Sequence, residues 1–442
     1  MTKQRLLPIA AMPALSLALL SALLPASAFA QDGRIDVADS GDTAWLLAAS
    51  ALVMLMAMPG LSLFYGGLVR TRNFLSVLIQ CGAIAAVASI AWVVVGYTVA
   101  FGEAGNGWLG SGNAWMLITL GNVREATAVP ESAFVLFQMT FAAITPALMA
   151  GAWVDRARFG WVVTFCGLWS LVVYAPVAHW LWGGGWLAEA VGTLDWAGGI
   201  VIHTTAGVSA LVVAVMLGKR KGFPTTLMLP HSPALTMAGA ALLWVGWFGF
   251  NGGSALAAND DAAAAIIATH VAAATAAMVW LVVERIKVGK PTGIGFATGA
   301  IAGLATVTPA AGFISPGAAI LFGAAAAVLC FFAIQLIKHR LEIDDSLDVF
   351  AVHGVGGMLG AVLLGLFMSE SLGGVGYAEG MNVVAQTVAQ VIGVVVVVVW
   401  SVIGTVILAL MASMLFPMRV SEDAEREGLD ITSHGERAWE FD

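Results

Sequence analysis

Two histidines of the sequence lie inside long apolar stretches, and the same spacing precedes both. Asp195 comes eight residues before His203, and Asp345 comes eight residues before His353. Ionisable side chains inside membrane spans usually face an internal cavity and serve transport or proton relay. In an apolar setting both imidazoles are expected to stay neutral, so that one ring donates a hydrogen bond and the other accepts it. The pair could therefore offer hydrogen bonds to a small polar solute inside a membrane.

Two other interpretations of these histidines are open. They could be two separate packing residues, or they could belong to a metal site. A metal site would need a third and a fourth ligand, and no Cys, His or carboxylate stands at a suitable spacing. Cys81, Cys166 and Cys330 all lie in apolar runs, and their odd number indicates no disulfide framework. We expect small core residues there, and the sequence predicts neither a metal nor another cofactor.

Carboxylates and aromatic clusters stand near the predicted span ends. Asp195 could bind a cation directly, or it could cap its helix through backbone N–H groups. We favour the cap, with the charge providing a favourable field for cations, and we expect the same of Asp345 and Asp348. Three aromatic clusters could hold a small cation by cation–π contact, although composition alone favours packing. These clusters are Phe137–Phe141, Trp180–Gly185 and Trp247–Ser254.

The composition places these residues in a membrane protein. Hydrophobic types make up 60% of the 442 residues, charged types make up 10%, and the net charge is −8. The mean hydropathy is +0.91. A soluble domain carries about 25% charged residues, so a soluble enzyme and a disordered protein are excluded. A nucleic-acid binder, which would need a basic surface, is excluded as well. Long uncharged runs exclude an outer-membrane barrel, whose strands alternate over about 10 residues.

A leader and eleven spans are predicted along the chain. Residues 1–30 resemble a secretory signal, with Lys3 and Arg5 before an apolar run and Ala28-Phe29-Ala30 as a cleavage pattern; an uncleaved helix is the alternative. A bilayer span needs about 20 apolar residues. The predicted spans are 43–67, 74–101, 132–152, 159–178, 198–218, 231–251, 262–283, 293–310, 314–337, 347–369 and 384–416. The membrane domain is thus expected at 31–416 and a tail at 417–442.

Basic residues gather after the odd-numbered spans. They are Arg70, Arg72, Arg156, Arg158, Lys219, Arg220, Lys221, Arg285, Lys287, Lys290, Lys338 and Arg340, followed by Arg419, Arg426 and Arg437 in the tail. Of the residues after the leader, Arg34 and Arg124 alone fall on the other side. The positive-inside rule therefore predicts an external N-terminus and a cytoplasmic C-terminus.

Three fragments recur in the same order. Phe64–Gly67 matches Phe250–Gly253, Ile144–Ala147 matches Val307–Ala310, and the two Asp–His spacings complete the series. The halves are spans 1–5 and 6–10, and an odd number of spans makes the second half enter from the opposite face. We therefore predict an all-α polytopic fold with 11 transmembrane helices, as two inverted five-helix repeats plus a long eleventh helix. Inverted repeats are typical of transporters and channels, with the site near mid-membrane.

These segments together resemble the ammonium transporter (Amt/Mep/Rh) family over essentially the whole mature chain. The matching motifs are FYGGLVR (64–70), FQMTFAAIT (137–145), APVAHWLWGGGW (175–186), DWAGGIVIH (195–203), GWFGFNGGS (246–254), VTPAAGF (307–313), DDSLDVFAVHGVGG (344–357), SLGGVGYAEG (371–380) and EREGLDITSHGE (425–436). Trp182 and its glycines look like the bacterial Amt branch rather than a Rh-type channel. The resemblance implies eleven spans, an inverted repeat, an external N-terminus and homotrimers with one pore per subunit.

The resemblance also implies roles for single residues. Trp182, Phe141 and Ser254 match the outer site that recruits ammonium, and Phe141 and Phe250 match a phenyl gate beneath it. His203 and His353 match the twin pore histidines. Asp195 matches the family's buried aspartate, and Phe137 is taken as a further supporting residue.

The implied function is an ammonium transporter in a bacterial cytoplasmic membrane, with methylammonium as an analogue. It would bind NH4+, deprotonate it and conduct NH3, with or without separate proton transfer. A PII-type regulator could bind the tail. The alternative is an ammonium-sensing receptor read by a cytoplasmic partner, which the short segment after Phe416 disfavours. An enzyme is not expected, because no nucleophile–base arrangement is found.

Overall fold

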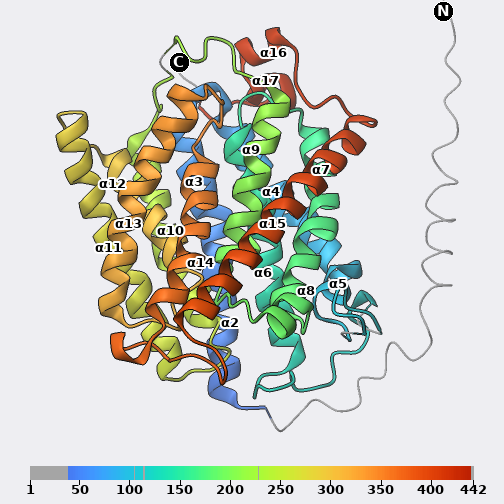
Figure 1. Cartoon of the computed structure of the whole chain (residues 1–442). Coiled ribbons are helices and arrows are strands. Elements are labelled where there is room, and N and C mark those ends of the chain that lie inside the picture. Colours follow the sequence, from blue (N-terminus) through green and yellow to red (C-terminus); the bar gives the residue numbers. More distant parts are fainter. Residues whose placement is uncertain (1–37, 104, 113–114, 227, 440–442) are drawn as a thin grey trace, which may run out of the picture.

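The structure is a computed structural model that describes residues 38–439 except 104, 113–114 and 227, and it forms one helical bundle (Figure 1). The predicted signal peptide at 1–30 lies outside the described residues. Within the described part of the chain, every regular element is a helix. This confirms the all-α prediction.

Helices stand at all eleven predicted spans. The first half contains α2 (Ser40–Leu55), η2 (Met56–Gly60) and α3 (Leu61–Leu68); η3 (Thr71–Asn73), α4 (Phe74–Ala91), η4 (Trp92–Gly96) and α5 (Tyr97–Phe101); α6 (Glu131–Met149) and η6 (Ala150–Ala152); α7 (Phe159–Trp169), η7 (Ser170–Tyr174) and α8 (Ala175–Trp182); and η9 (Gly199–Thr204) and α9 (Thr205–Leu217). The second half contains α10 (Pro233–Gly253), α11 (Asp260–Lys287), α12 (Gly293–Val307), α13 (Pro316–Gln335) with η10 (Leu336–Arg340), and η11 (Phe350–Gly354) with α14 (Val355–Phe367). The long α15 (Val383–Ser413) follows and crosses the bundle obliquely (Figure 1).

The eighth span is shorter than predicted. Ten helical segments are long and apolar enough to cross a membrane among the residues described, whereas α12 has only 15 residues. The predicted span reached residue 310, but α12 ends at Val307, just before Thr308 and Pro309. Pro309 has no N–H to donate to the Ala305 carbonyl, and the chain leaves the helix in a turn closed by the Ala310 amide on the Val307 carbonyl at 2.9 Å. Ser232 caps α10 and Pro233 opens it, so that this helix begins two residues after its predicted start.

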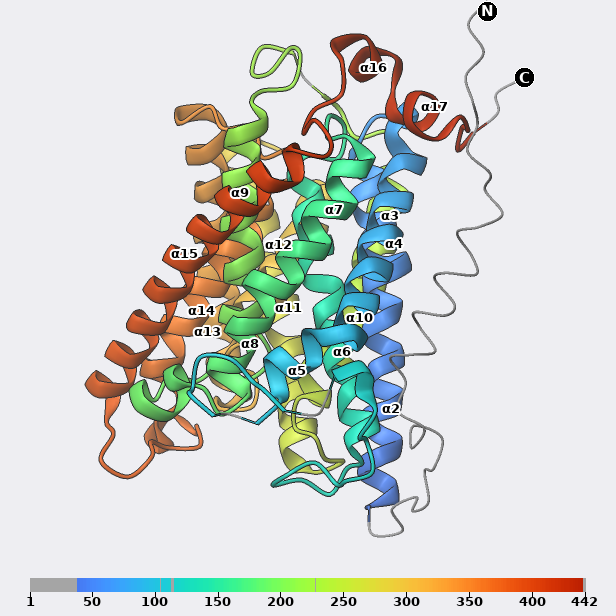
Figure 2. The same cartoon turned by 90° about the vertical axis from the view of Figure 1, so that its right-hand side faces the viewer.

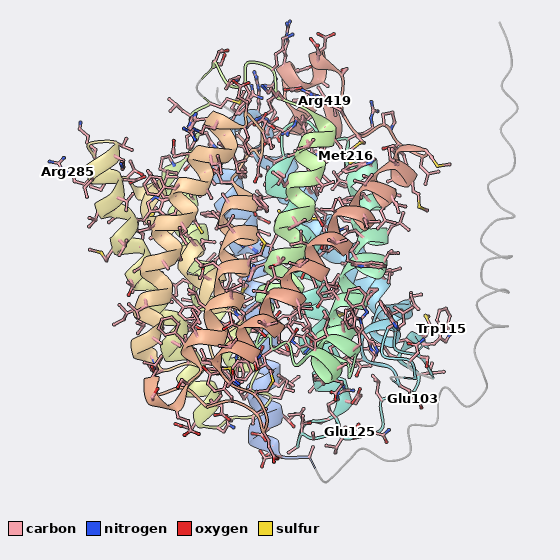
Figure 3. The ribbon with its side chains drawn as sticks, viewed as in Figure 1. Glu103, Trp115, Glu125, Met216, Arg285 and Arg419 are labelled. Carbon is pink, nitrogen blue, oxygen red and sulfur yellow. The ribbon has the colours of Figure 1, made fainter. Side chains whose placement is uncertain are left out.

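Charge separates the two ends of the bundle. We call the end that carries α16 (Glu422–Glu427) and α17 (Leu429–His434) the tail end, and the opposite end the loop end (Figures 1 and 2). Figure 3 shows Arg285 and Arg419 at the tail end and Glu103 and Glu125 at the loop end. The helix order puts all the basic residues predicted on one side at the tail end. Arg124 lies in the loop-end segment between α5 and α6.

The tail lies against the helices of its own chain. Asp430 accepts hydrogen bonds from the backbone of Leu75 and Ser76 at 3.2 and 2.8 Å, at the start of α4. Asn73 accepts one from the Leu429 amide at 2.9 Å. The Glu425 carboxylate meets the Arg419 guanidinium at 2.7 Å. The two bonds to Asp430 satisfy amides at the start of α4 that have no intrahelical partner, so the tail completes the α4 N-terminus.

A buried ion cluster fixes the segment that leads into η11. Arg156, which is fully buried, donates to the Ser346 hydroxyl and to the Asp344 carbonyl, both at 2.6 Å. Arg220 holds the Asp344 carboxylate at 2.7 Å and approaches Asp155 at 3.3 Å. Burial alone would raise the pKa of Asp344, but the Arg220 and Arg156 guanidiniums hold it below its usual value. Removing one partner would leave a buried charge uncompensated, so three connecting segments are held together here.

The two histidine-bearing segments cross at glycines. His203 lies in the π-helical turn η9 and His353 in the π-helical turn η11, each leading into its helix. Gly207 and Gly357 stand four residues after these histidines. A Cβ on Gly207 would lie 2.2 Å from the Gly354 nitrogen, and a Cβ on Gly357 would lie 2.4 Å from the Gly199 oxygen. The backbones therefore touch at corresponding positions of the inverted repeat.

Gly207→Ala is expected to destabilise the bundle. The added methyl group would meet backbone atoms that cannot move independently, at a cost of about 3 kcal/mol or more. Gly82→Ala is the matched control, because its Cβ would meet only the Met58 methyl at 3.8 Å, and alanine favours a helix interior. Thermal unfolding in detergent, followed by size-exclusion chromatography, measures both. Equal melting temperatures for Gly207→Ala and the unsubstituted chain would contradict the backbone contact.

Candidate functional site

The two histidines predicted to form a pair meet in the interior. Their Nδ1 atoms lie 3.2 Å apart, and their rings are nearly parallel at 14°. His203 is 1% exposed and His353 is 3% exposed, so water does not surround them. One Nδ1 must carry the hydrogen and the other must accept it. The Nε2 atom of the donor ring is then an acceptor, and that of the acceptor ring is a donor.

An aromatic support holds His203. The Trp247 ring stacks on His203 with centroids 5.3 Å apart. The Trp247 indole donates to the Thr308 hydroxyl at 2.8 Å, and Thr308 donates to the Leu304 carbonyl at 2.7 Å. From the sequence, Trp247 is a member of an aromatic cluster with no separate predicted role. The available signal was Thr308, which belongs to one of the recurring fragments.

Two cavities adjoin the histidine pair. The first has a volume of about 10 Å³ and is lined by both histidines and by apolar side chains that include Phe250, Trp247 and Ile144. This is about the volume needed to hold one water-sized molecule. The second has a volume of about 190 Å³ and runs from His353 toward the tail end. Phe64 and His353 line both cavities, which therefore adjoin.

A series of aromatic rings connects the pair to the loop end. Phe250 lies 6.1 Å from His203 between ring centroids, and Phe141 lies 4.4 Å from Phe250. Phe141 contacts Phe137 at 4.7 Å and Trp182 at 5.9 Å. The three phenylalanines are buried, and Trp182 is half-buried. The predicted gate residues thus touch, and Trp182 lies on the loop-end side of them.

Ser254 follows α10 directly and is half-buried. Its hydroxyl donates to the Phe250 carbonyl at 3.0 Å, which leaves the oxygen available as an acceptor. The Trp182 indole N–H donates to the Asp195 carbonyl at 2.7 Å, so its ring orientation is fixed. Ser254 is thus bonded at the Phe250 end of the aromatic series, and Trp182 contacts its Phe141 end.

Asp195 caps its helix and has no acceptor position left for a cation. Its two oxygens accept four backbone N–H bonds of 2.8–2.9 Å, from residues 198, 199, 200 and 201. A carboxylate offers about four lone-pair positions, so all of them are used. Gly198, at φ +114°, gives the chain the left-handed turn that aims these amides at the carboxylate. The capping interpretation therefore holds over direct binding.

The carboxylates before His353 behave differently. Asp345 accepts from the Phe350 amide at 2.7 Å and is also hydrogen-bonded by the Val349 amide. The expected cap fails for Asp348, whose carboxylate pairs with the Lys338 ammonium at 2.8 Å. Asp348 has a left-handed φ of +63°, so the chain reverses at this residue. Because its carboxylate is bound by Lys338, it does not cap η11.

Comparisons with known proteins agree with this geometry. A sequence model described as Ammonium Transporter Family matches residues 44–439. An ammonium transporter of Aquifex aeolicus is 42% identical, over 93% of this chain and 96% of its own length. The crystal structure of Candida albicans Mep2 is 36% identical, with a TM-score of 0.81 over 88% of each chain. A structure titled Sensor Amt Protein is 28% identical, with a TM-score of 0.83 over 89% of this chain and 98% of its own.

Asp195→Asn is expected to lower the melting temperature. An amide side chain has one acceptor oxygen, and its NH2 group would face backbone N–H donors. Each amide left unsatisfied costs about 1–3 kcal/mol. Asp39→Asn is the control, because Asp39 accepts a single bond from the Asp42 amide, at 2.8 Å, and asparagine caps equally well. The melting temperatures of both variants are measured by thermal unfolding. An equal decrease in the two variants would contradict the special role of Asp195.

Proposed function

The chain belongs to the ammonium transporter family, whose members are transporters rather than enzymes, and we propose that it conducts ammonium as neutral ammonia past the histidine pair. The observation that carries this proposal is the contact of His203 and His353 beside a small apolar cavity. Trp182, Phe141 and Ser254 are the proposed binding residues for NH4+ at the loop end. Phe141 and Phe250 form the gate, and Phe137 and Asp195 support it.

Binding at the loop end uses the ring face and the hydroxyl. A desolvated cation over an aromatic face gains about 2 kcal/mol. NH4+ also donates a hydrogen bond to Ser254, whose own proton is bonded to the Phe250 carbonyl. Asp195 acts without contact, because its charge adds a favourable field while its oxygens stay bound to amides.

Selectivity follows from acid–base chemistry. Burying a charge at a helix centre costs at least about 3 kcal/mol on insertion scales. Ammonium avoids this cost by giving up a proton near the Phe141 and Phe250 rings, which lie in tilted contact, whereas potassium has no proton to give. Ammonia then passes the histidines, whose Nε2 atoms replace hydrogen bonds that it made to water. His203 Nε2 is buried and has no hydrogen-bond partner among the described residues. The proton either returns to the loop end or crosses separately.

The proposed setting is a bacterial cytoplasmic membrane, with residues 1–30 as a signal peptide, residues 31–416 as the membrane domain and residues 417–442 as a cytoplasmic tail. The loop end faces outward and the tail end faces the cytoplasm, because the basic residues gather at the tail end. We further propose a homotrimer with one conduit per subunit, which rests on the family resemblance.

A second candidate function is an ammonium-sensing receptor. Its support is the similarity to the structure titled Sensor Amt Protein. A receptor would bind ammonium but conduct little. The aligned histidines and the adjoining cavities favour conduction, so we place transport first.

Replacing both His203 and His353 by alanine is expected to abolish selective ammonium transport, because ammonia would lose its hydrogen-bond partners in the apolar cavity. Currents from proteoliposomes on a solid support would be compared for ammonium, methylammonium and potassium. His270→Ala is the control, since this histidine of α11 lines neither cavity adjoining the pair. Unchanged ammonium transport with unchanged potassium rejection in the double variant would contradict the mechanism. Ammonium binding without current in the unsubstituted protein would favour the receptor.

The tail is proposed to bind a PII-type regulator at the tail end. Purified PII-type protein is expected to be retained by the full chain in a pull-down and lost when residues 420–442 are deleted. Glu125→Ala is the control, because this residue lies at the loop end (Figure 3). Equal retention by the deletion variant would place the binding surface elsewhere.

A further inference from the structure

The cavity of about 190 Å³ on the tail-end side of His353 carries charged groups on its wall. Its lining includes Tyr65, Val352 and His353 together with Lys338, Ser346 and Asp348. A molecule that leaves the histidine pair toward the tail end enters this space. The first ionised groups it meets are therefore Lys338 and Asp348.

Lys338 binds there as an ammonium group between two oxygen ligands. Its Nζ lies 2.8 Å from an Asp348 carboxylate oxygen and donates to the Ser346 carbonyl at 3.2 Å. The two side chains of the pair are 19% and 21% exposed, so the pair is partly hydrated. A partly hydrated pair exchanges partners readily, in contrast to a fully buried one.

Asp348 cannot follow Lys338 if the lysine leaves. Its amide donates to the Asp345 carbonyl at 3.3 Å, and its carbonyl accepts from the Val352 amide at 3.0 Å. Val352 directly precedes His353. The carboxylate is thus fixed to the segment that carries the pore histidine, whereas Lys338 reaches it on a flexible four-carbon side chain.

We propose that Lys338 is a tethered competitor of the transported ion at the tail-end exit. This inference rests on the proposed function. Ammonia that leaves the pore becomes NH4+ by taking a proton from water, which leaves hydroxide in the tail-side solution. NH4+ carries the same kind of N–H donors as the lysine ammonium. The Asp348 carboxylate and the Ser346 carbonyl would bind it in the same way. Lys338 occupies these ligands, so the product ion leaves instead of remaining at the exit.

Loss of the lysine and loss of the carboxylate then have opposite consequences. Lys338→Met exposes the Asp348 carboxylate to ammonium on the tail side, so that product accumulation inhibits transport. Asp348→Asn removes the anionic ligand, and combining it with Lys338→Met removes the inhibition again. Lys338→Arg keeps a cation beside Asp348 and should resemble the unsubstituted chain.

The test uses right-side-out membrane vesicles, in which the tail end faces the lumen under the proposed orientation. Initial uptake of labelled methylammonium is measured with ammonium chloride or choline chloride in the lumen, and each variant is compared with its own choline rate. Lys338→Met is expected to be inhibited by lumenal ammonium at least about threefold more than the unsubstituted chain, a change of about 0.6 kcal/mol at the exit. The double variant should lose this excess.

Lys287→Met is the matched control, because this lysine lies near the same end but does not line the cavity. Excess inhibition in Lys338→Met alone supports the proposal. Equal inhibition in Lys338→Met and the unsubstituted chain overturns it, as does excess inhibition that persists in the double variant. If Lys338→Met does not fold, Lys338→Gln is measured under the same criteria. Absence of ammonium-sensitive uptake in the unsubstituted chain would instead contradict the proposed function.

Discussion

The contact between two imidazole rings inside an apolar bundle depends on how closely two backbones can approach. The Nδ1 atoms are 3.2 Å apart only because η9 with α9 and η11 with α14 cross in backbone contact at Gly207 and Gly357. Larger side chains at these glycines would separate the rings beyond hydrogen-bond reach. The four amides bonded to Asp195 fix the start of η9 at the loop end of the bundle. The buried ion cluster at Asp344 fixes the segment that leads into η11 at the tail end. Together they hold the two histidine-bearing segments so that Gly207 and Gly357 stay at the point of backbone contact.

The spans, their orientation and the histidine pair could be predicted from the sequence, because a membrane-spanning chain shows them directly in its hydropathy and charge patterns. Long apolar runs predicted the spans, basic residues marked one end, and the repeated Asp–His spacing indicated that the two histidines are equivalent. The support of His203 by Trp247 and Thr308 could not be predicted, since it joins α10 to the residues after α12. Hydropathy does not predict the early end of α12, because apolar residues resume at Ala310 and Ala311, whereas Pro309 supplies no amide hydrogen to extend the helix.

The carboxylates show why equal spacing does not mean an equal role. Asp195 and Asp345 occupy corresponding positions, yet four amides donate to Asp195, whereas the Phe350 and Val349 amides alone donate to Asp345 among the described residues. The difference lies in the chain that follows each of them. Gly198 permits the left-handed turn after Asp195, whereas Asp348 takes the left-handed position after Asp345 and directs its own carboxylate to Lys338. A residue-type pattern cannot distinguish these cases, because the backbone turn decides which donors face the carboxylate.

The inverted repeat therefore supplies a symmetric backbone on which the two ends carry different chemistry. On the loop-end side of the histidines, the Phe141 and Phe250 rings lie in contact, and Asp195 stays fully bonded to amides. The cavity at the histidines themselves has room for about one small molecule. On the tail-end side, a wider cavity carries Lys338 and Asp348 on its wall. Charge is thus kept out of the narrow part and allowed in the wide part, where a partly hydrated ion pair costs little. Under the proposed function, a charged species is disfavoured only between the Phe141–Phe250 contact and His353. The proposed change of protonation state would then be confined to that stretch, and the two ends could differ in how tightly they hold the ion.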